Sequence, residues 1–204
     1  MRAIRPGDTW GSQGRLAEGA PVVRTDAELR RLVTDAHRAN RPAGEVGLLG
    51  GDLCRTVGGA GSVERLRTPE AARLPVDVGQ VLLDGRLHLF VAHLVARRRF
   101  WNGPFLVAMN AQWLGEWDLG PRAHPGDGLL DLTWGSLPFT QRLEARRRAG
   151  SGDHLPHPGL THRRLAHHSE RFARPVTVWL DGERVGDARD VVVRVEPAAL
   201  TVVV

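Results

Sequence analysis

Carboxylates beside glycines are the residues of this chain best suited to chemistry. Asp-Gly occurs three times, at Asp84, Asp127 and Asp181, and Glu183 directly follows the third pair. Asp181 and Glu183 could together supply a general base for a substrate hydroxyl and a ligand for a metal or nucleotide. Asp127 and Asp131 could hold a hard cation such as Mg²⁺ or Ca²⁺, because such cations prefer oxygen ligands.

The same Asp-Gly pairs also have a purely structural explanation. Glycine and aspartate tolerate the positive φ angles that tight hairpin turns require. Each of the three pairs is therefore sufficiently explained as a turn between strands. On pattern alone the turn interpretation is favoured over the catalytic one.

A third candidate lies at Gly50-Gly51-Asp52, which follows an apolar run. A glycine turn between a strand and a helix can cradle a phosphate with its backbone N–H groups. A tight strand-to-helix turn accounts for it equally well. Cys54, just beyond, is interpreted as a small buried apolar residue. It is the single cysteine, so no intrachain disulfide is possible, which fits a reducing compartment.

The charge balance limits the chemistry and the partners. All 28 basic residues are arginine, with a formal net charge of +5. Without lysine, the chain has neither a P-loop lysine nor a Schiff-base lysine. The basic surface either attracts phosphate groups of lipid or nucleic acid or is simply solvated. No apolar stretch approaches the ~20 residues of a spanning helix, and no signal peptide is recognised, so we expect a cytoplasmic location.

The first part of the chain predicts a piece of an α/β unit. Thr25 and Glu28 have the spacing of a capping box, which predicts a helix over about 26–39. A buried strand is expected at 46–49, a short helix at 52–57, and a loop-like connection at 58–75. Strand, helix and glycine turn in this order are typical of parallel α/β units.

From residue 76 onward the pattern predicts antiparallel strands with Asp-Gly turns. The Arg/His-rich stretch 142–174 interrupts this pattern, and its role is not evident. The predicted fold class is α+β, mostly β, with a truncated α/β segment at 1–60 and an antiparallel β-sandwich at 61–204. The expected strands are 76–83, 86–95, 105–113, 129–134, 176–180, 184–185, 191–195 and, after a turn at Pro197, 200–204.

Several motifs together resemble those of the diacylglycerol kinase and sphingosine kinase family. The run from Leu119 to Asp131, with its Asp-Gly-Leu-Leu-Asp, is similar to a family signature. The similarity covers roughly residue 45 to the end. The other matching segments, in the family's order, are Gly47 to Thr56, Gly152-Asp153-His154, Arg163-Arg164, and Val178 to Glu183 with its Asp-Gly-Glu.

The resemblance implies an ATP-dependent lipid kinase with its nucleotide in a cleft between an α/β domain and a β-sandwich. Asp181 would be the base that takes the proton of the lipid hydroxyl. Glu183 would help to hold ATP and Mg²⁺, with Asp52 and Gly51 near the same cleft. Asp127 and Asp131 would lie in a metal-associated loop. The implied partner is a lipid such as a diacylglycerol, met by a cytoplasmic protein peripheral to the membrane.

The sequence departs from the family at the phosphate loop. Where the family has Gly-Gly-Asp-Gly-Thr, this chain has the run from Val22 to Ala27 without glycine, and Gly51 replaces the family asparagine before Asp52. By the same resemblance, we expect residues 1–60 to be only a truncated remnant of the family's α/β domain. We therefore carry two hypotheses: a lipid kinase whose activity is weak, absent or dependent on a partner chain or homodimer, and a non-catalytic lipid-binding or protein-interaction module. Nucleic-acid binding is disfavoured.

Overall fold

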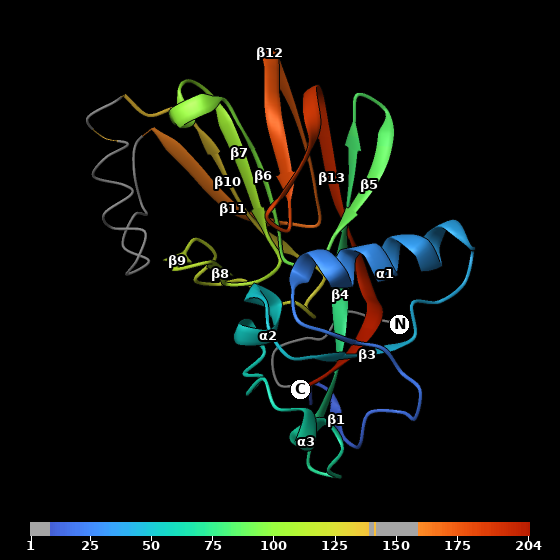
Figure 1. Cartoon of the computed structure of the whole chain (residues 1–204). Coiled ribbons are helices and arrows are strands. Elements are labelled where there is room, and N and C mark those ends of the chain that lie inside the picture. The colour runs from blue at the N-terminus through green and yellow to red at the C-terminus, as the bar shows by residue number, and fades with distance from the viewer. Residues whose placement is uncertain (1–8, 139–140, 142–158) are drawn as a thin grey trace.

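The computed structural model describes residues 9–138, 141 and 159–204, so Gly152-Asp153-His154 and the rest of 142–158 lie outside the described residues. Within the described part, the chain forms an 11-stranded sheet and a two-stranded one, with short helices beside them (Figure 1). The helices are α1 (Asp26–Arg38), α2 (Asp52–Thr56), α3 (Val63–Leu66) and the 3₁₀ helix η1 (Arg99–Trp101). The strands are β1 (Ser12–Gln13), β2 (Val22–Val23), β3 (Glu45–Leu48), β4 (Ala72–Leu83), β5 (Arg86–Phe90), β6 (His93–Arg97), β7 (Phe105–Met109), β8 (Trp113–Leu114), β9 (Trp117–Asp118), β10 (Leu130–Gly135), β11 (Leu160–Leu165), β12 (His167–Leu180) and β13 (Glu183–Val203).

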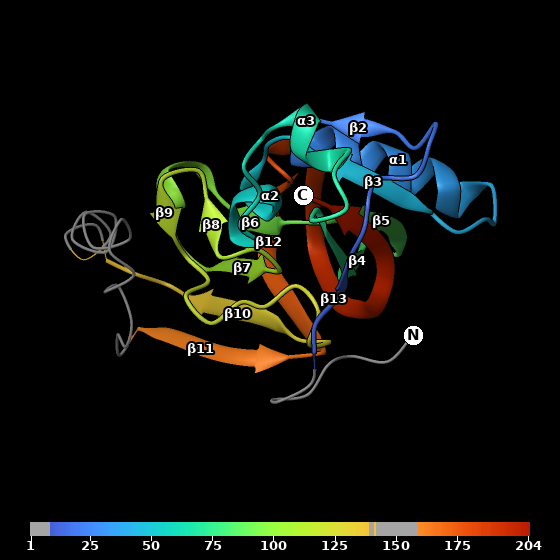
Figure 2. The same ribbon diagram turned by 90° about the horizontal axis from the view of Figure 1, so that it is seen from below.

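The large sheet curls on itself and encloses an apolar core. Its neighbours follow the order β1, β4, β13, β12, β6, β7, β10 and β11. Figure 2 shows β10 and β11 on one side of the curl and β4 and β5 on the other. Alternate residues point inward, such as Leu94 and Ala96 of β6 against Leu106 and Ala108 of β7. The predicted fold class, α+β and mostly β with an antiparallel sandwich, is confirmed.

Residues 9–60 contain the expected strand and helices. Thr25 Oγ1 accepts a hydrogen bond from the Glu28 N–H at 3.2 Å, so the capping residue is the predicted one. The Glu28 carboxylate reaches back one residue further than expected and accepts from the Arg24 N–H at 2.7 Å. Leu29 and Val33 lie on the apolar face of α1, and both side chains are buried. The predicted helix over 26–39, strand over 46–49 and helix over 52–57 are confirmed as α1, β3 and α2 within one or two residues.

The long strand β13 belongs to both parts of the chain. It pairs with β12 and β4 in antiparallel fashion, and its last residues, Thr201–Val203, pair in parallel with β3. At the predicted Pro197 turn, β13 continues, and its register with β4 shifts between Glu196 and Leu200. Ala198 has φ 49° there. A bulge accommodates Pro197, which has no N–H to donate, without ending the strand. The division into 1–60 and 61–204 stays a prediction; one sheet runs through both.

Several segments differ from expectation. The predicted strand 105–113 is two strands of different sheets, β7 and β8. The predicted loop 58–75 contains α3, capped by Ser62, and the start of β4, because Leu66 and Ala71 are buried there. The predicted single strand 86–95 is two strands, β5 and β6, because the N–H groups of Val91 and Ala92 turn to a side chain instead of a neighbouring strand. The described part of 142–174 carries β11 and much of β12. The apolar alternation is weak there because these residues are largely accessible to solvent.

None of the helices described in residues 9–138, 141 and 159–204 has the length and apolar character needed to cross a lipid bilayer.

Asp77 joins three segments of the sandwich. Its carboxylate is fully buried and accepts hydrogen bonds from the N–H groups of Gly128, at 2.7 Å, and Ala198, at 2.8 Å. Asp77 itself lies on β4, Gly128 in the second Asp-Gly turn, and Ala198 in the bulge of β13. Burial raises the pKa of Asp77, and the two N–H groups oppose this shift. The side chain therefore fixes the turn and the bulge to the same strand.

Asp77→Asn tests this junction. The amide keeps one acceptor but points an NH₂ group at the second buried N–H, so we expect a loss of about 1 to 3 kcal/mol in the free energy of unfolding. Asp84→Asn is the matched control, because exposed Asp84 also accepts from two backbone N–H groups, those of Arg189 and Asp190. Both N–H groups donate to Asp84 Oδ1, an acceptor that the asparagine carbonyl oxygen can replace, so Asp84→Asn should cost clearly less than Asp77→Asn. Urea denaturation measures both, and equal losses would contradict the assigned role of Asp77.

Candidate functional site

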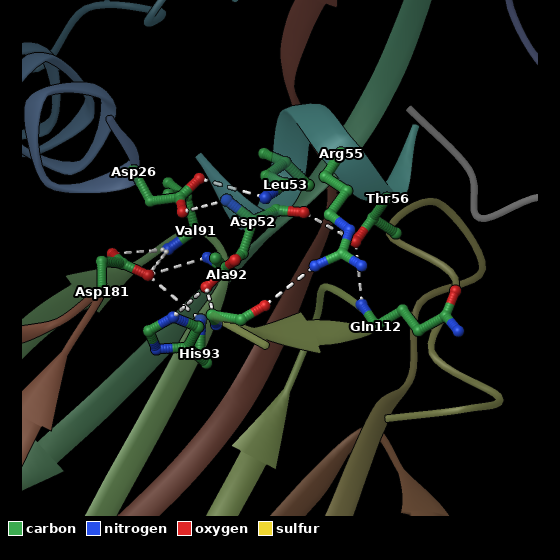
Figure 3. Close-up of polar contacts among 11 residues, drawn as sticks. Asp26, Asp52, Leu53, Arg55, Thr56, Val91, Ala92, His93, Gln112 and Asp181 are labelled. Atoms are coloured by element: carbon green, nitrogen blue, oxygen red, sulfur yellow. Dashed lines mark hydrogen bonds and ion pairs between the residues drawn. The ribbon is translucent and has the colours of Figure 1, made fainter. Parts of the chain in front are cut away.

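Asp181 lies in the turn between β12 and β13, and its carboxylate is enclosed by backbone. It accepts hydrogen bonds from three successive N–H groups, those of Val91 at 3.0 Å, Ala92 at 2.8 Å and His93 at 3.0 Å (Figure 3). The Asp181 N–H in turn donates to the His93 carbonyl at 2.9 Å. Arg30 Nε of α1 lies 3.6 Å from Oδ2, and the Asp181 side chain has no exposed surface. The third Asp-Gly turn therefore holds a buried charge as well as a bend.

The surroundings of the Asp181 carboxylate raise its pKa and so make it a stronger base. Burial raises its pKa, while the nearby His93 and the three N–H groups lower it and so limit the rise. A base is most effective when its pKa approaches the working pH. Because the carboxylate is fully enclosed, however, it can meet a substrate only if Arg30 and α1 move away.

Asp52 and His93 form a second pair beside Asp181. His93 Nε2 is 3.1 Å from Asp52 Oδ2, and the Gly115 N–H donates to the same oxygen at 3.0 Å. Burial works against the charge of both partners. The hydrogen bond between them nevertheless leaves the pKa of Asp52 below its usual value and that of His93 above it, with the charges of Asp181 and Asp26 raising the latter further. The two side chains therefore favour an ion pair.

Asp26, the first residue of α1, caps the next helix. Its carboxylate accepts from the N–H groups of Asp52, at 2.6 Å, and Leu53, at 3.1 Å. Gly51, which directly precedes Asp52, has φ 95°, and a Cβ there would lie 2.5 Å from Asp26 Oδ1. Glycine is thus required at position 51. The turn that the sequence offers as a phosphate cradle already directs two of its N–H groups to a carboxylate.

Asp26, Asp52 and His93 could together hold a metal ion. One ligand atom from each lies within 4.8 Å of the other two. Two carboxylate oxygens and one imidazole nitrogen suit a divalent cation once His93 has released its proton, with the oxygens the better match for Mg²⁺. Sequence reasoning found Asp52 but missed Asp26 and His93.

Arginines from both helices border this cluster. Arg30 and Arg31 of α1 form ion pairs with Glu183, which follows the Asp181 turn. Arg55 of α2 donates to the Gly115 carbonyl at 2.9 Å, and its guanidinium lies 3.4 Å from the ring centre of Trp113. The three guanidinium groups provide positive charge next to the carboxylates. Arg30 contacts the carboxylates of both Asp181 and Glu183, so these two residues lie together, as their separation by one glycine suggested.

Asp127 and Asp131 do not have the surroundings expected of a metal loop. Arg164 of β11 forms ion pairs with both, through Nη2 to Asp127 and through Nε to Asp131 at 3.1 Å. The Leu129 N–H donates to Asp127 and the Arg122 N–H to Asp131. A guanidinium group thus lies between the carboxylates where a cation would have to bind. The residues present do not fit a metal ion in this arrangement.

Cys54 agrees with its interpretation as a small buried residue. It is 2% exposed, and burial, with the charge of Asp26 adding to it, raises the pKa of its thiol. A thiol with a raised pKa is a poor nucleophile.

The sequence comparison decides the family. Residues 60–204 match the model of the YegS C-terminal NAD kinase beta sandwich-like domain. The chain belongs to this family. No curated protein sequence matches it. Two structures of a Bacillus anthracis strain Sterne protein assigned as a diacylglycerol kinase share 14% identity, cover 89% of this chain and 76% of theirs, and have TM-scores of 0.65 and 0.66. A third, from the same organism, has 14% identity, 78% and 66% coverage, and a TM-score of 0.56.

Membership of the YegS C-terminal family confirms the resemblance drawn from the sequence motifs, and the shared fold agrees with it. The match begins at residue 60, whereas Asp26 and Asp52 lie before it. The carboxylate cluster therefore combines residues of the family domain with residues of the preceding segment. The roles assigned to individual site residues stay predictions.

Asp26→Asn should change how stability depends on pH. Burial, with the charge of Asp181 adding to it, raises the pKa of Asp26 to about 6, from 3.8. The folded protein therefore holds this proton more tightly than the unfolded chain, and ionisation costs stability as the pH rises. Between about pH 4 and 7 the wild type should lose about 1 to 3 kcal/mol relative to Asp26→Asn. Urea denaturation across this range measures the difference, and a constant or growing advantage of the wild type would contradict the prediction.

Proposed function

We propose that this chain is a phosphotransferase of the lipid kinase type, which transfers the γ-phosphate of ATP to the hydroxyl of a lipid such as a diacylglycerol. The observation that carries the proposal is the meeting of Asp181 with Asp52, Asp26 and His93 under Arg30 of α1. Phosphoryl transfer depends mainly on positioning and charge neutralisation. Buried carboxylates bordered by arginines provide for both.

In this proposal Asp181 takes the proton of the lipid hydroxyl. The hydroxyl oxygen attacks the γ-phosphorus, the bond from that phosphorus to the bridging oxygen breaks, and ADP leaves. The raised pKa of Asp181 supports its role as proton acceptor. Access requires Arg30 and Arg31 to release Glu183, and phosphate oxygens are groups that can draw guanidinium away from a carboxylate.

Magnesium fits the proposal at Asp52 and Asp26. These residues would hold the ion with His93 beside them, since their ligand atoms lie within 4.8 Å of one another. When bound, Mg²⁺ would neutralise charge on the phosphates. The chain's own contribution is the ionised Asp52 carboxylate, which His93 and the Gly115 N–H keep oriented.

The proposal is tested by transfer of label from γ-labelled ATP to diacylglycerol in mixed micelles with Mg²⁺. We expect transfer by the wild type and a loss of about 100-fold or more in Asp181→Asn, because the base is removed. Asp84→Asn is the matched control, since it changes the same residue type in an Asp-Gly hairpin whose contacts are with Arg189 and Asp190.

Folded wild type that transfers no label to any lipid hydroxyl would refute the catalytic proposal. Binding of lipid without transfer would then identify the chain as a non-catalytic lipid-binding module. Equal activity of wild type and Asp181→Asn would refute the role of Asp181 alone.

A further inference from the structure

We propose that Arg164 is a built-in replacement for the metal cation at Asp127 and Asp131, so that this loop is closed by a guanidinium group of the chain itself. The proposal does not depend on the kinase activity. It concerns the loop between β9 and β10, and its tests measure cation binding and stability.

All four carboxylate oxygens of the pair are engaged. Asp127 Oδ1 accepts from the Leu129 N–H at 3.0 Å, and Oδ2 pairs with Arg164 Nη2. Asp131 Oδ2 accepts from the Arg122 N–H at 3.1 Å, and Oδ1 lies 3.1 Å from Arg164 Nε, though not aligned as a hydrogen bond. The guanidinium therefore contacts one oxygen of each carboxylate, as a bridging cation would.

The sheet places the guanidinium there. Asp131 of β10 is directly opposite Arg164 of β11 in the antiparallel register. Side chains directly opposite each other point to the same face of a sheet. The Asp131 side chain has no exposed surface, that of Asp127 is 18% exposed and that of Arg164 31%. A slip of β11 by one residue would move Arg164 to the other face.

The charges favour arginine over a divalent ion while Arg164 is present. Two carboxylates and one guanidinium leave one net negative charge, and a divalent ion added to this group would lie against the guanidinium. Burial raises the pKa of Asp131, and the charge of Arg164 opposes that rise. Magnesium also requires near-octahedral oxygen coordination, whereas the guanidinium group of Arg164 faces one oxygen of each carboxylate.

Removal of the guanidinium should create a cation site. Arg164→Gln leaves two carboxylates at a largely buried position, and a divalent ion can then neutralise both without protonation of either. With Mn²⁺ at about 100 times its dissociation constant, the Tm of this variant should rise by about 5 to 10 °C relative to the same protein in EDTA. The part of this rise that exceeds the wild-type rise should disappear in Arg164→Gln/Asp127→Asn, because an ion held by Asp26, Asp52 and His93 would bind to both. Arg163→Gln, which removes the same charge from the next, exposed residue of β11, should behave as the wild type.

The wild type provides a test that does not depend on the folding of any Arg164 variant. The Tm difference between Mn²⁺ and EDTA should be the same in wild type and Asp127→Asn, because any ion held by Asp26, Asp52 and His93 binds equally to both. A Mn²⁺-dependent rise that Asp127→Asn abolishes would show that a metal displaces Arg164 and would overturn the proposal. Arg164→Gln that folds but gains no Mn²⁺ site would overturn it as well.

Discussion

The burial of the Asp181 charge is the constraint around which the site is built. A carboxylate removed from water is costly unless it is paired and hydrogen-bonded. Three successive N–H groups and Arg30 meet that need, and the N–H groups are available because β5 and β6 separate at Val91. The same separation makes His93 the first residue of β6, where its ring meets Asp52. One buried charge thus links a hairpin turn, a break between strands and both N-terminal helices.

The local sequence signals predicted the helices and strands better than they predicted the side-chain contacts of the site. The capping box at Thr25 and the glycine turn before Asp52 gave α1 and α2, because caps and turns depend on neighbouring residues. His93 lies within an apolar run that suggests a continuous strand, and Asp26 is recognisable only as a residue of a first helical turn. Their partners are 41 and 26 residues away, respectively, along the chain. Contacts of that kind are set by tertiary packing, so the residues involved do not recur at a characteristic spacing in the sequence.

The three Asp-Gly turns show why one local pattern cannot assign a function. Asp84 is exposed and accepts from the N–H groups of Arg189 and Asp190 of the long strand. Asp127 faces Arg164, which was grouped with it only as part of a family pattern, and Asp181 is buried under α1. The turn chemistry is common to all three, whereas burial and charge differ. Those two properties depend on what packs over each turn, and the dipeptide does not contain that information.

The path of β13 has a consequence for the order in which the chain acquires structure during synthesis. Strand β3 ends at Leu48, but the strand beside it, Thr201–Val203, leaves the ribosome more than 150 residues later. At ~5 to 20 residues per second this delay is about 8 to 30 s. Throughout that time β3 has an unpaired edge, which can attract other extended chains. The pairing of β3 with β13 therefore cannot form before β13 has been translated.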